Sequence, residues 1–242
     1  MLIVFASEQD QTARGFVRRW TRVGVALMTP SDLARPGWCC ISSDPAHSQC
    51  VAEGVSCPSS AIRGVLIRSP YIFPSDLPMI VPAERNFVAS EMNAFLIYWL
   101  NSLDVPVLNR PTPRSLCGPG WYPEHWTIQA ANLGFNVPTI EQSVRLTHIQ
   151  PSAWAQHSGP SVDITIVGET CLGSATAKLV GRARALARAA GVDFVRFRFD
   201  TADADACFLA ADLFPPLDDV AIEGAVLEYF ERRQPANAAV AN

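Results

Sequence analysis

In the first part of the chain, hydrophobic residues occur as short unbroken runs separated by a helical pattern. Residues 2–6 read LIVFA, residues 11–22 place apolar side chains on one side of a helix, and residues 23–28 are mainly apolar again. Unbroken apolar runs of this length are typical of strands that are buried on both faces. A strand, a helix and a second strand in this order predict a parallel sheet.

Two further strands are predicted at residues 64–68 and 105–108, and the clearest helical periodicity lies between them at residues 83–103. The connections at residues 31–60 and 69–82 contain proline and glycine, which favour turns and loops, so both are expected to be irregular. The first part of the chain therefore predicts an open, Rossmann-like parallel sheet.

In the second part, apolar and polar residues alternate, a pattern typical of strands with one face exposed to water. Strands are predicted at residues 162–166, 192–199 and 207–211, and helices at residues 124–133, 176–190 and 219–233. Gly134 and Gly191 follow two of these helices, where a glycine commonly ends the helix. We therefore expect an α/β protein in which the parallel sheet is followed by a smaller α+β domain with an antiparallel sheet.

This pattern divides the chain into three parts. We expect a parallel α/β domain at residues 1–114, an α+β domain at residues 115–233, and a polar, alanine-rich tail at residues 234–242.

Composition narrows the function classes. Hydrophobic residues make up 49% of the chain, the net charge is −4 and the pI is about 5.6, so the sequence lacks the basic excess of a nucleic-acid binder. No apolar run reaches the roughly 18 residues that span a membrane. The apolar start lacks the basic residues of a signal peptide, so we expect a cytoplasmic protein whose seven cysteines are reduced thiols.

Four stretches carry recognisable motifs. The helix and strand at residues 83–113 end in LNRPTP, residues 124–139 form a helix followed by GFNVPT, residues 162–174 carry a Val-Gly turn, and residues 207–230 combine a strand, the turn DLFPPLDD and a last helix. In this order they resemble the ATP-grasp superfamily, specifically the glutathione-synthetase-like ligases that modify peptides. The resemblance implies a pre-ATP-grasp sheet followed by a remnant of the ATP-grasp domain.

The chain departs from the family's pattern at the groups that hold ATP and magnesium. Family members grip the phosphates with lysines, whereas the single lysine of this chain, Lys178, lies on the helix after the third motif. Only about 22 residues separate Thr139 from Val162, too few for the family's lid, since an independent sheet needs more chain. The family's Glu-x-Asn metal ligands correspond to Ala210 and Asp212, so at most Asp212 is retained.

These departures lead to two hypotheses. The first is a lid-less, degenerate ATP-grasp-like protein that acts as a non-catalytic binding or partner subunit in peptide or small-molecule biosynthesis or modification. It would have a protein or peptide partner and no assigned cofactor. The alternative is an ATP-dependent carboxylate–amine ligase that uses ATP and Mg²⁺, with Arg110, Arg114, Arg145 and Asp212 as its candidate residues and a lid supplied by a second chain.

A ligand site is predicted where the parallel strands end. Arg68, Asn109, Arg110 and Arg114 all follow such strands, and the ends of neighbouring parallel strands meet at one edge of a sheet. Arginine binds carboxylates and phosphates through two parallel hydrogen bonds. We therefore expect a site for a small anion or a peptide carboxylate, with structural ion pairs and hydrogen bonds as the alternative role of Arg110.

The cysteines suggest two further sites. Cys117 lies in a Gly-Pro-Gly loop eight residues before His125, so the two form a candidate nucleophile pair, unless Cys117 simply packs beneath its loop. A second group is dense enough to bind zinc, although its spacing matches no CxxC pair and reduced thiols in a loop are the alternative. This group contains Cys39, Cys40, His47, Cys50 and Cys57.

Overall fold

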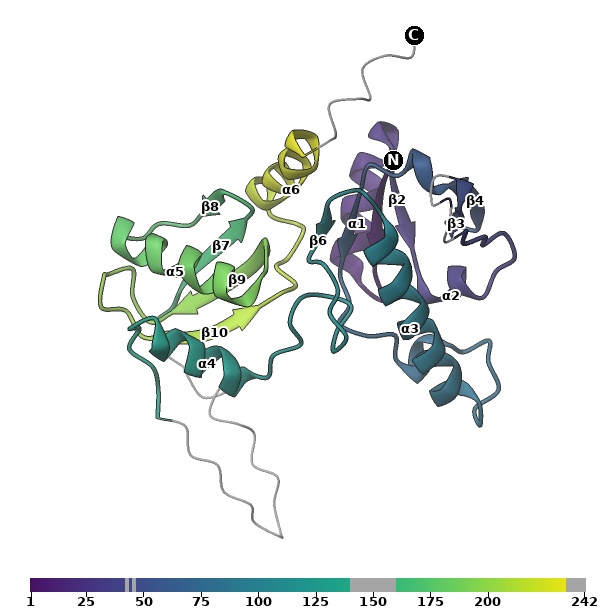
Figure 1. Cartoon of the computed structure of the whole chain (residues 1–242). Coiled ribbons are helices and arrows are strands. Elements are labelled where there is room, and N and C mark those ends of the chain that lie inside the picture. Colours follow the sequence, from purple (N-terminus) through teal and green to yellow (C-terminus); the bar gives the residue numbers. More distant parts are fainter. Residues whose placement is uncertain (42–43, 45–46, 140–159, 234–242) are drawn as a thin grey trace. The chain divides into compact units, whose positions relative to one another are not determined.

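The computed structural model of the chain shows two compact units (Figure 1). The parallel unit comprises Met1–Gly120 and Pro216–Asn242, and the antiparallel unit comprises Trp121–Pro215. The structure describes residues 1–41, 44, 47–139 and 160–233. The predicted tail at residues 234–242 and most of the segment between Thr139 and Val162 lie outside the described residues.

The parallel unit is built on a four-stranded sheet with the strand order β2-β1-β5-β6. Its strands are β1 (Leu2–Phe5), β2 (Val25–Met28), β5 (Gly64–Ile67) and β6 (Val107–Leu108). All three strand pairs are parallel, which confirms the sheet predicted from the unbroken apolar runs. The residues of β1 and β5 are buried without exception, as expected for central strands covered on both faces.

The helices of this unit are α1 (Gln11–Trp20), α2 (Pro30–Leu33), α3 (Arg85–Ser102) and α6 (Val220–Arg232), with 3-10 turns at Thr21–Val23, Ser59–Ala61 and Pro74–Asp76. The final helix, α6, groups with this unit rather than with the residues that immediately precede it. Glu223 of α6 is buried and accepts hydrogen bonds from Arg19 and from the indole nitrogen of Trp20. This charged contact fixes α6 beside the end of α1.

The segment at residues 31–60 is not wholly irregular, contrary to the sequence-based expectation. It contains a hairpin formed by β3 (Gln49–Ala52) and β4 (Val55–Pro58). Glu53 and Gly54 form its two-residue turn with φ values of 51° and 75°, the left-handed geometry that matches the twist of a hairpin. The sequence gives no signal for this turn, because glutamate rarely adopts a positive φ.

The antiparallel unit contains a sheet with the strand order β10-β9-β7-β8. Its strands are β7 (Val162–Val167), β8 (Thr170–Leu172), β9 (Phe194–Phe199) and β10 (Phe208–Asp212), and its helices are α4 (Pro123–Asn132) and α5 (Ala177–Ala190). Both helices pack against one face of the sheet, where Phe197 and Phe199 join the helices' apolar residues in one core (Figure 1). The antiparallel arrangement confirms the prediction from alternating residues.

The described residues include no helix that is both long enough and apolar enough to cross a membrane. Taken together, the two units confirm the predicted α/β fold, with a parallel sheet in one unit and an antiparallel sheet in the other.

The close approach of α6 to β5 can be tested at Gly64. A Cβ atom added to Gly64 would lie 2.3 Å from a ring carbon of Phe230, so one of the two elements must move. We expect Gly64→Ala to lower the free energy of unfolding by about 1–3 kcal/mol in urea denaturation. Phe230→Leu in the same background should recover part of that loss because the two sites are in contact.

Gly181→Ala provides the matched control. Gly181 lies within α5 and has open space around the added atom, so its replacement should stabilise the protein by about 0.5–1 kcal/mol. A Gly64→Ala variant as stable as the wild type would show that Phe230 of α6 does not pack closely against Gly64 of β5.

Candidate functional site

Arg68 follows β5, but its side chain turns to the start of α1 rather than to an open site. Its side chain is 5% exposed, and its Nε donates to Asp10 Oδ2 over 3.2 Å while Nη2 donates to the Thr12 hydroxyl over 3.1 Å. Asp10 also caps α1 by accepting a hydrogen bond from the Ala13 N–H over 2.9 Å. Arg68 therefore connects the end of a strand to the beginning of a helix.

These contacts change the acidity of Asp10. Burial on its own would raise the pKa of the Asp10 carboxyl, but the Ala13 N–H, the charge of Arg68 and the Thr12 hydroxyl outweigh it and lower the pKa. The carboxylate is thereby kept ionised beside the buried guanidinium, whose charge it balances.

Asn109 and Cys117 lie together beneath the loop that follows β6. Both are 1% exposed, and Asn109 Nδ2 donates to Cys117 Sγ over 3.7 Å. The Cys117 thiol also lies 3.7 Å from the carbonyl oxygen of Ile67, at the end of β5. This environment agrees with Cys117 as a small buried residue that packs beneath its loop, because a nucleophile needs access to its substrate.

The remaining arginines of the predicted strand-end site are both exposed. Arg110 is exposed and donates through Nη2 to the Val105 carbonyl over 2.9 Å, and Arg114 is exposed in the next loop. Strands β5 and β6 are neighbours, as the prediction required, so Arg68 and Asn109 do begin from adjacent strand ends. The side chain of Arg68 contacts Asp10 and Thr12, whereas that of Asn109 contacts Cys117.

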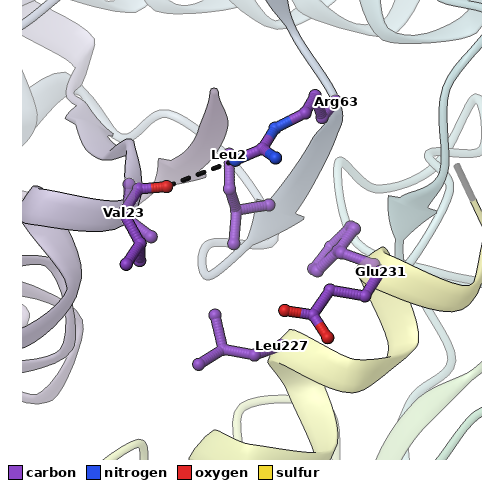
Figure 2. Close-up of a pocket in the computed structure, with 7 residues that line it drawn as sticks. Leu2, Val23, Arg63, Leu227 and Glu231 are labelled. Carbon is purple, nitrogen blue, oxygen red and sulfur yellow. Dashed lines mark hydrogen bonds between the residues drawn. The ribbon is translucent and has the colours of Figure 1, made fainter. Parts of the chain in front are cut away.

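A small pocket lies at the end of the same sheet where strands β1 and β2 begin (Figure 2). It has a volume of about 150 Å³ and is lined by apolar residues of β1, β2 and α6 together with Arg63 and Glu231. Arg63 Nη2 donates to the carbonyl oxygen of Val23 over 3.2 Å. Open α/β sheets bind ligands at the carboxyl ends of their strands, so this pocket is best described as loose packing between α6 and the sheet.

The antiparallel unit carries a more distinctive cluster on the sheet face away from α4 and α5. Arg196 and Arg198 alternate with phenylalanines along β9, so both arginines face away from the aromatic core. In the strand register Asp163 of β7 pairs with Arg198, and Asp212 of β10 pairs with Arg196. We call these four residues the arginine–aspartate face.

The charges on this face are paired. Arg196 Nη2 lies 2.7 Å from Asp212 Oδ2, and Arg196 Nη1 lies 3.6 Å from Asp163 Oδ2. Arg198 donates to both oxygens of Asp163, over 2.9 Å from Nε and 3.2 Å from Nη2, and its hydrogen bond to Asp163 raises the pKa of Arg198. Two guanidinium groups and two carboxylates thus balance one another.

Asp212, the predicted metal ligand, has both oxygens engaged. Oδ2 accepts from Arg196, and Oδ1 accepts from the backbone N–H of Phe214 over 2.8 Å. Ala210, two residues earlier on β10, faces the same side opposite Arg198 and offers no side-chain oxygen. No three His, Cys, Asp or Glu residues in the part of the chain that the structure describes are grouped closely enough to hold a metal ion.

The other predicted residues are dispersed. His125 is exposed on α4, where its ring stacks on Tyr122 with 6.1 Å between centroids. Lys178 lies in the first turn of α5, and its ammonium lies 3.8 Å from an exposed carboxylate oxygen of Asp205. Arg145 lies outside the described residues.

No model of a protein family matches the chain, and no curated protein matches it by sequence. Several solved structures share its fold. Macrocyclase MdnC from Microcystis aeruginosa MRC, bound with precursor peptide MdnA, is 12% identical with a TM-score of 0.63, and the match covers 96% of this chain and 99% of MdnC.

Two further structures are similar to the same degree. A RiPP-associated ATP-grasp ligase from Chryseobacterium gregarium, in complex with ADP and a leader and core peptide, is 10% identical with a TM-score of 0.65, and the match covers 97% of each chain. ATP-grasp ligase PsnB, complexed with a minimal precursor, is 10% identical with a TM-score of 0.64, covering 94% of this chain and 98% of PsnB. The chain therefore has the ATP-grasp fold, as its sequence motifs predicted.

The Asp10–Arg68 pair gives a prediction about pH. Because the pKa of Asp10 is lowered in the folded protein, its ionised form stabilises the fold above about pH 4, and this contribution is lost as the pH falls through the folded-state value. We expect Asp10→Asn to cost about 2–4 kcal/mol of unfolding free energy at pH 7, and the difference from wild type to shrink as the pH falls below about 4.

Asp219→Asn serves as the control, measured by the same urea denaturation series. Asp219 caps α6 by accepting a hydrogen bond from the Ala221 N–H, but it is exposed. Asp219→Asn should lower the free energy of unfolding by about 0.5 kcal/mol or less. A pH-independent Asp10→Asn effect would contradict the assigned role of the ion pair.

Proposed function

We propose that this chain is an ATP-grasp-fold protein that binds a peptide or protein partner in a peptide-modification pathway and does not itself catalyse ligation. The peptide part of the proposal is supported by the solved structures of similar fold. MdnC is bound with a precursor peptide, PsnB with a minimal precursor, and the Chryseobacterium gregarium ligase with a leader and core peptide. The non-catalytic part is supported by the arginine–aspartate face.

The observation that carries the proposal is the environment of Asp212. Mg²⁺ demands near-octahedral oxygen coordination and is commonly held by one or two carboxylates together with phosphate oxygens. Ala210 supplies no carboxylate, and the guanidinium of Arg196 lies against Asp212. A cation placed at Asp212 would meet a fixed positive charge and would lack the second protein ligand that the family's Glu-x-Asn motif provides.

Magnitudes show which of these effects matters most. The Asp212 side chain is 35% exposed, and ion pairs at such positions contribute only about 0–1 kcal/mol, so the bond to Arg196 by itself would not exclude a metal. The missing carboxylate and the like charge of Arg196 remain even when that bond is broken. The proposal therefore rests on which residues make up the arginine–aspartate face. On this face the guanidinium groups of Arg196 and Arg198 are already paired with carboxylates, which occupy the positions that phosphate groups would need.

The alternative function is an ATP-dependent carboxylate–amine ligase in which arginines bind the phosphates. It is favoured by the ADP complex of the Chryseobacterium gregarium ligase, whose fold this chain shares. In that case Arg196 or Arg198 would leave its carboxylate for a phosphate oxygen, and a partner chain would supply the lid. The two functions differ in whether nucleotide binds to the purified chain.

Calorimetry tests the nucleotide question directly. Titration of ATP and Mg²⁺ into the purified chain is expected to release no heat beyond that of dilution, because the arginine–aspartate face lacks a metal site. Micromolar binding, or hydrolysis of ATP by the chain alone, would favour the ligase instead.

A gain-of-binding variant makes this test sharper. Ala210→Glu combined with Arg196→Gln adds a second carboxylate beside Asp212 and removes the repelling charge. We expect the double variant to bind Mn²⁺ at least about tenfold more tightly than wild type, measured by electron paramagnetic resonance, since hard cations prefer paired carboxylates. Arg198→Gln, which removes one charge without adding a ligand, is the matched control and should change Mn²⁺ binding less.

The peptide part of the proposal is tested through the neighbouring genes. We expect one of them to encode a short precursor peptide or a full-length ATP-grasp ligase. A fluorescently labelled synthetic version of that peptide should bind this chain in anisotropy measurements equally well with and without ATP and Mg²⁺. Peptide binding that requires the nucleotide would support the ligase function. If the chain binds neither the peptide nor the ligase encoded beside it, both functions are contradicted.

A further inference from the structure

Two cysteines face each other across the β3–β4 hairpin. Cys50 and Cys57 are direct partners in the antiparallel register, and their sulfur atoms are 3.2 Å apart. The Cα atoms of hydrogen-bonded antiparallel partners are about 5.5 Å apart, which lies within the range that a disulfide spans. The two thiols can therefore be joined without a change of register.

The hairpin backbone holds this register at several points. The N–H of Gly54 in the turn donates to Asp32 Oδ1 over 2.8 Å, and the N–H of Glu53 donates to the carbonyl oxygen of Leu27 over 3.0 Å. At the open end, the N–H of Ser59 donates to the carbonyl oxygen of Ser48 over 2.8 Å. The closeness of the two sulfurs thus follows from a hairpin tied at both ends.

The two thiols have different environments. Cys50 is fully buried, whereas Cys57 is partly exposed. The hydrogen bond from Cys50 lowers the pKa of Cys57 to about 7, although burial opposes this shift. The same bond, together with burial, raises the pKa of Cys50. An attacking thiol is most effective when its pKa is close to the ambient pH, so Cys57 suits the role of nucleophile.

The nearby thiols differ from this pair. Cys39 and Cys40 are both exposed. Partial burial of the Cys40 thiol, with a smaller contribution from Cys39, raises the pKa of Cys40, whereas the pKa of Cys57 is lowered. Within the described part of the chain, the cysteines and His47 form no group able to hold a metal ion. The geometry of Cys50 and Cys57 is that of a dithiol rather than of a zinc site.

We propose that Cys50 and Cys57 form a thiol–disulfide exchange site for small-molecule disulfides, in which Cys57 attacks and Cys50 resolves. The Cys57 thiolate attacks one sulfur of the disulfide, forms a mixed disulfide and expels one thiolate, which takes up a proton. The Cys50 thiol then loses its proton and attacks the Cys57 sulfur, expelling the second thiolate. Two electrons pass from the protein to the small disulfide, which becomes two thiols, and the cysteines become a cross-strand disulfide.

This site is independent of the proposed function, because neither cysteine belongs to the arginine–aspartate face. Its test uses the full chain equilibrated in glutathione redox buffers, quenched with acid and then alkylated. Trypsin does not cleave between Arg35 and Pro36, so residues 23–63 remain one peptide with four cysteines. Cys39→Ser/Cys40→Ser is therefore the reference protein, in which that peptide contains only the proposed pair.

In the reference protein we expect the peptide to escape alkylation and to lose two hydrogen atoms in mass as glutathione disulfide increases. Adding Cys50→Ala should instead leave a glutathione adduct on Cys57 that persists, because the resolving thiol is gone. The adduct should form more slowly than the disulfide of the reference protein, because the hydrogen bond that lowers the pKa of Cys57 is also lost. Adding Cys57→Ser should slow the reaction with glutathione disulfide at least about tenfold, because the low-pKa thiol is gone. Circular dichroism spectra and melting curves establish that each variant is folded.

Two results would overturn the proposal. One is that the wild-type chain forms its disulfide or glutathione adduct at Cys39 or Cys40 while Cys50 and Cys57 stay reduced. The other is that a folded Cys50→Ala variant accumulates no more adduct than the reference protein. Cys50→Val, which fills the buried site with an apolar side chain, repeats the second test if the alanine variant is unstable.

Discussion

The guanidinium of Arg196 lies between the carboxylates of Asp212 and Asp163, and the proposed function depends on the charges that this face of the antiparallel sheet carries. It arises from the alternation of side chains along β9, where Phe197 and Phe199 enter the core and Arg196 and Arg198 face away from it. On β10 the register shifts between Phe208 and Ala210, and this shift places Ala210 opposite Arg198 and Asp212 opposite Arg196. A surface of this composition is close to electrically neutral, whereas a site for magnesium and a triphosphate needs separate acidic and basic regions.

Most of the fold could be predicted from the sequence, because the burial of a strand on one or both faces determines the pattern of apolar and polar residues along it. The unbroken apolar runs of β1 and β5 identified the parallel sheet, and the alternation in β7 and β9 identified the antiparallel one. The β3–β4 hairpin could not be predicted in this way, because its turn places Glu53 at a positive φ, which glutamate rarely adopts. The grouping of α6 with the parallel unit depends on the buried contact between Arg19 and Glu223, which are far apart in the chain.

The candidate site shows the limit of reasoning from strand ends. Topology correctly places Arg68 and Asn109 after neighbouring strands, yet their side chains find partners within the fold. For Arg68 the reason is physical: a guanidinium that is 5% exposed requires a nearby carboxylate, and Asp10 is already fixed there as the cap of α1. Sequence patterns identify which element carries a charge, but they do not show which partner that charge selects.

The same argument separates the two cysteine-containing loops. Cys117 was the natural candidate for a nucleophile because of its position after a parallel strand, but it lies buried against Asn109 and the Ile67 carbonyl. Cys57 stood in a segment expected to be irregular, and only the hairpin register shows that Cys50 faces it. A thiol's reactivity depends on which group stabilises its thiolate and on its access to solvent. Cys57 satisfies both requirements through its partner and its partial exposure, so the chemistry of this chain is better sought in the hairpin than in the strand-end loop.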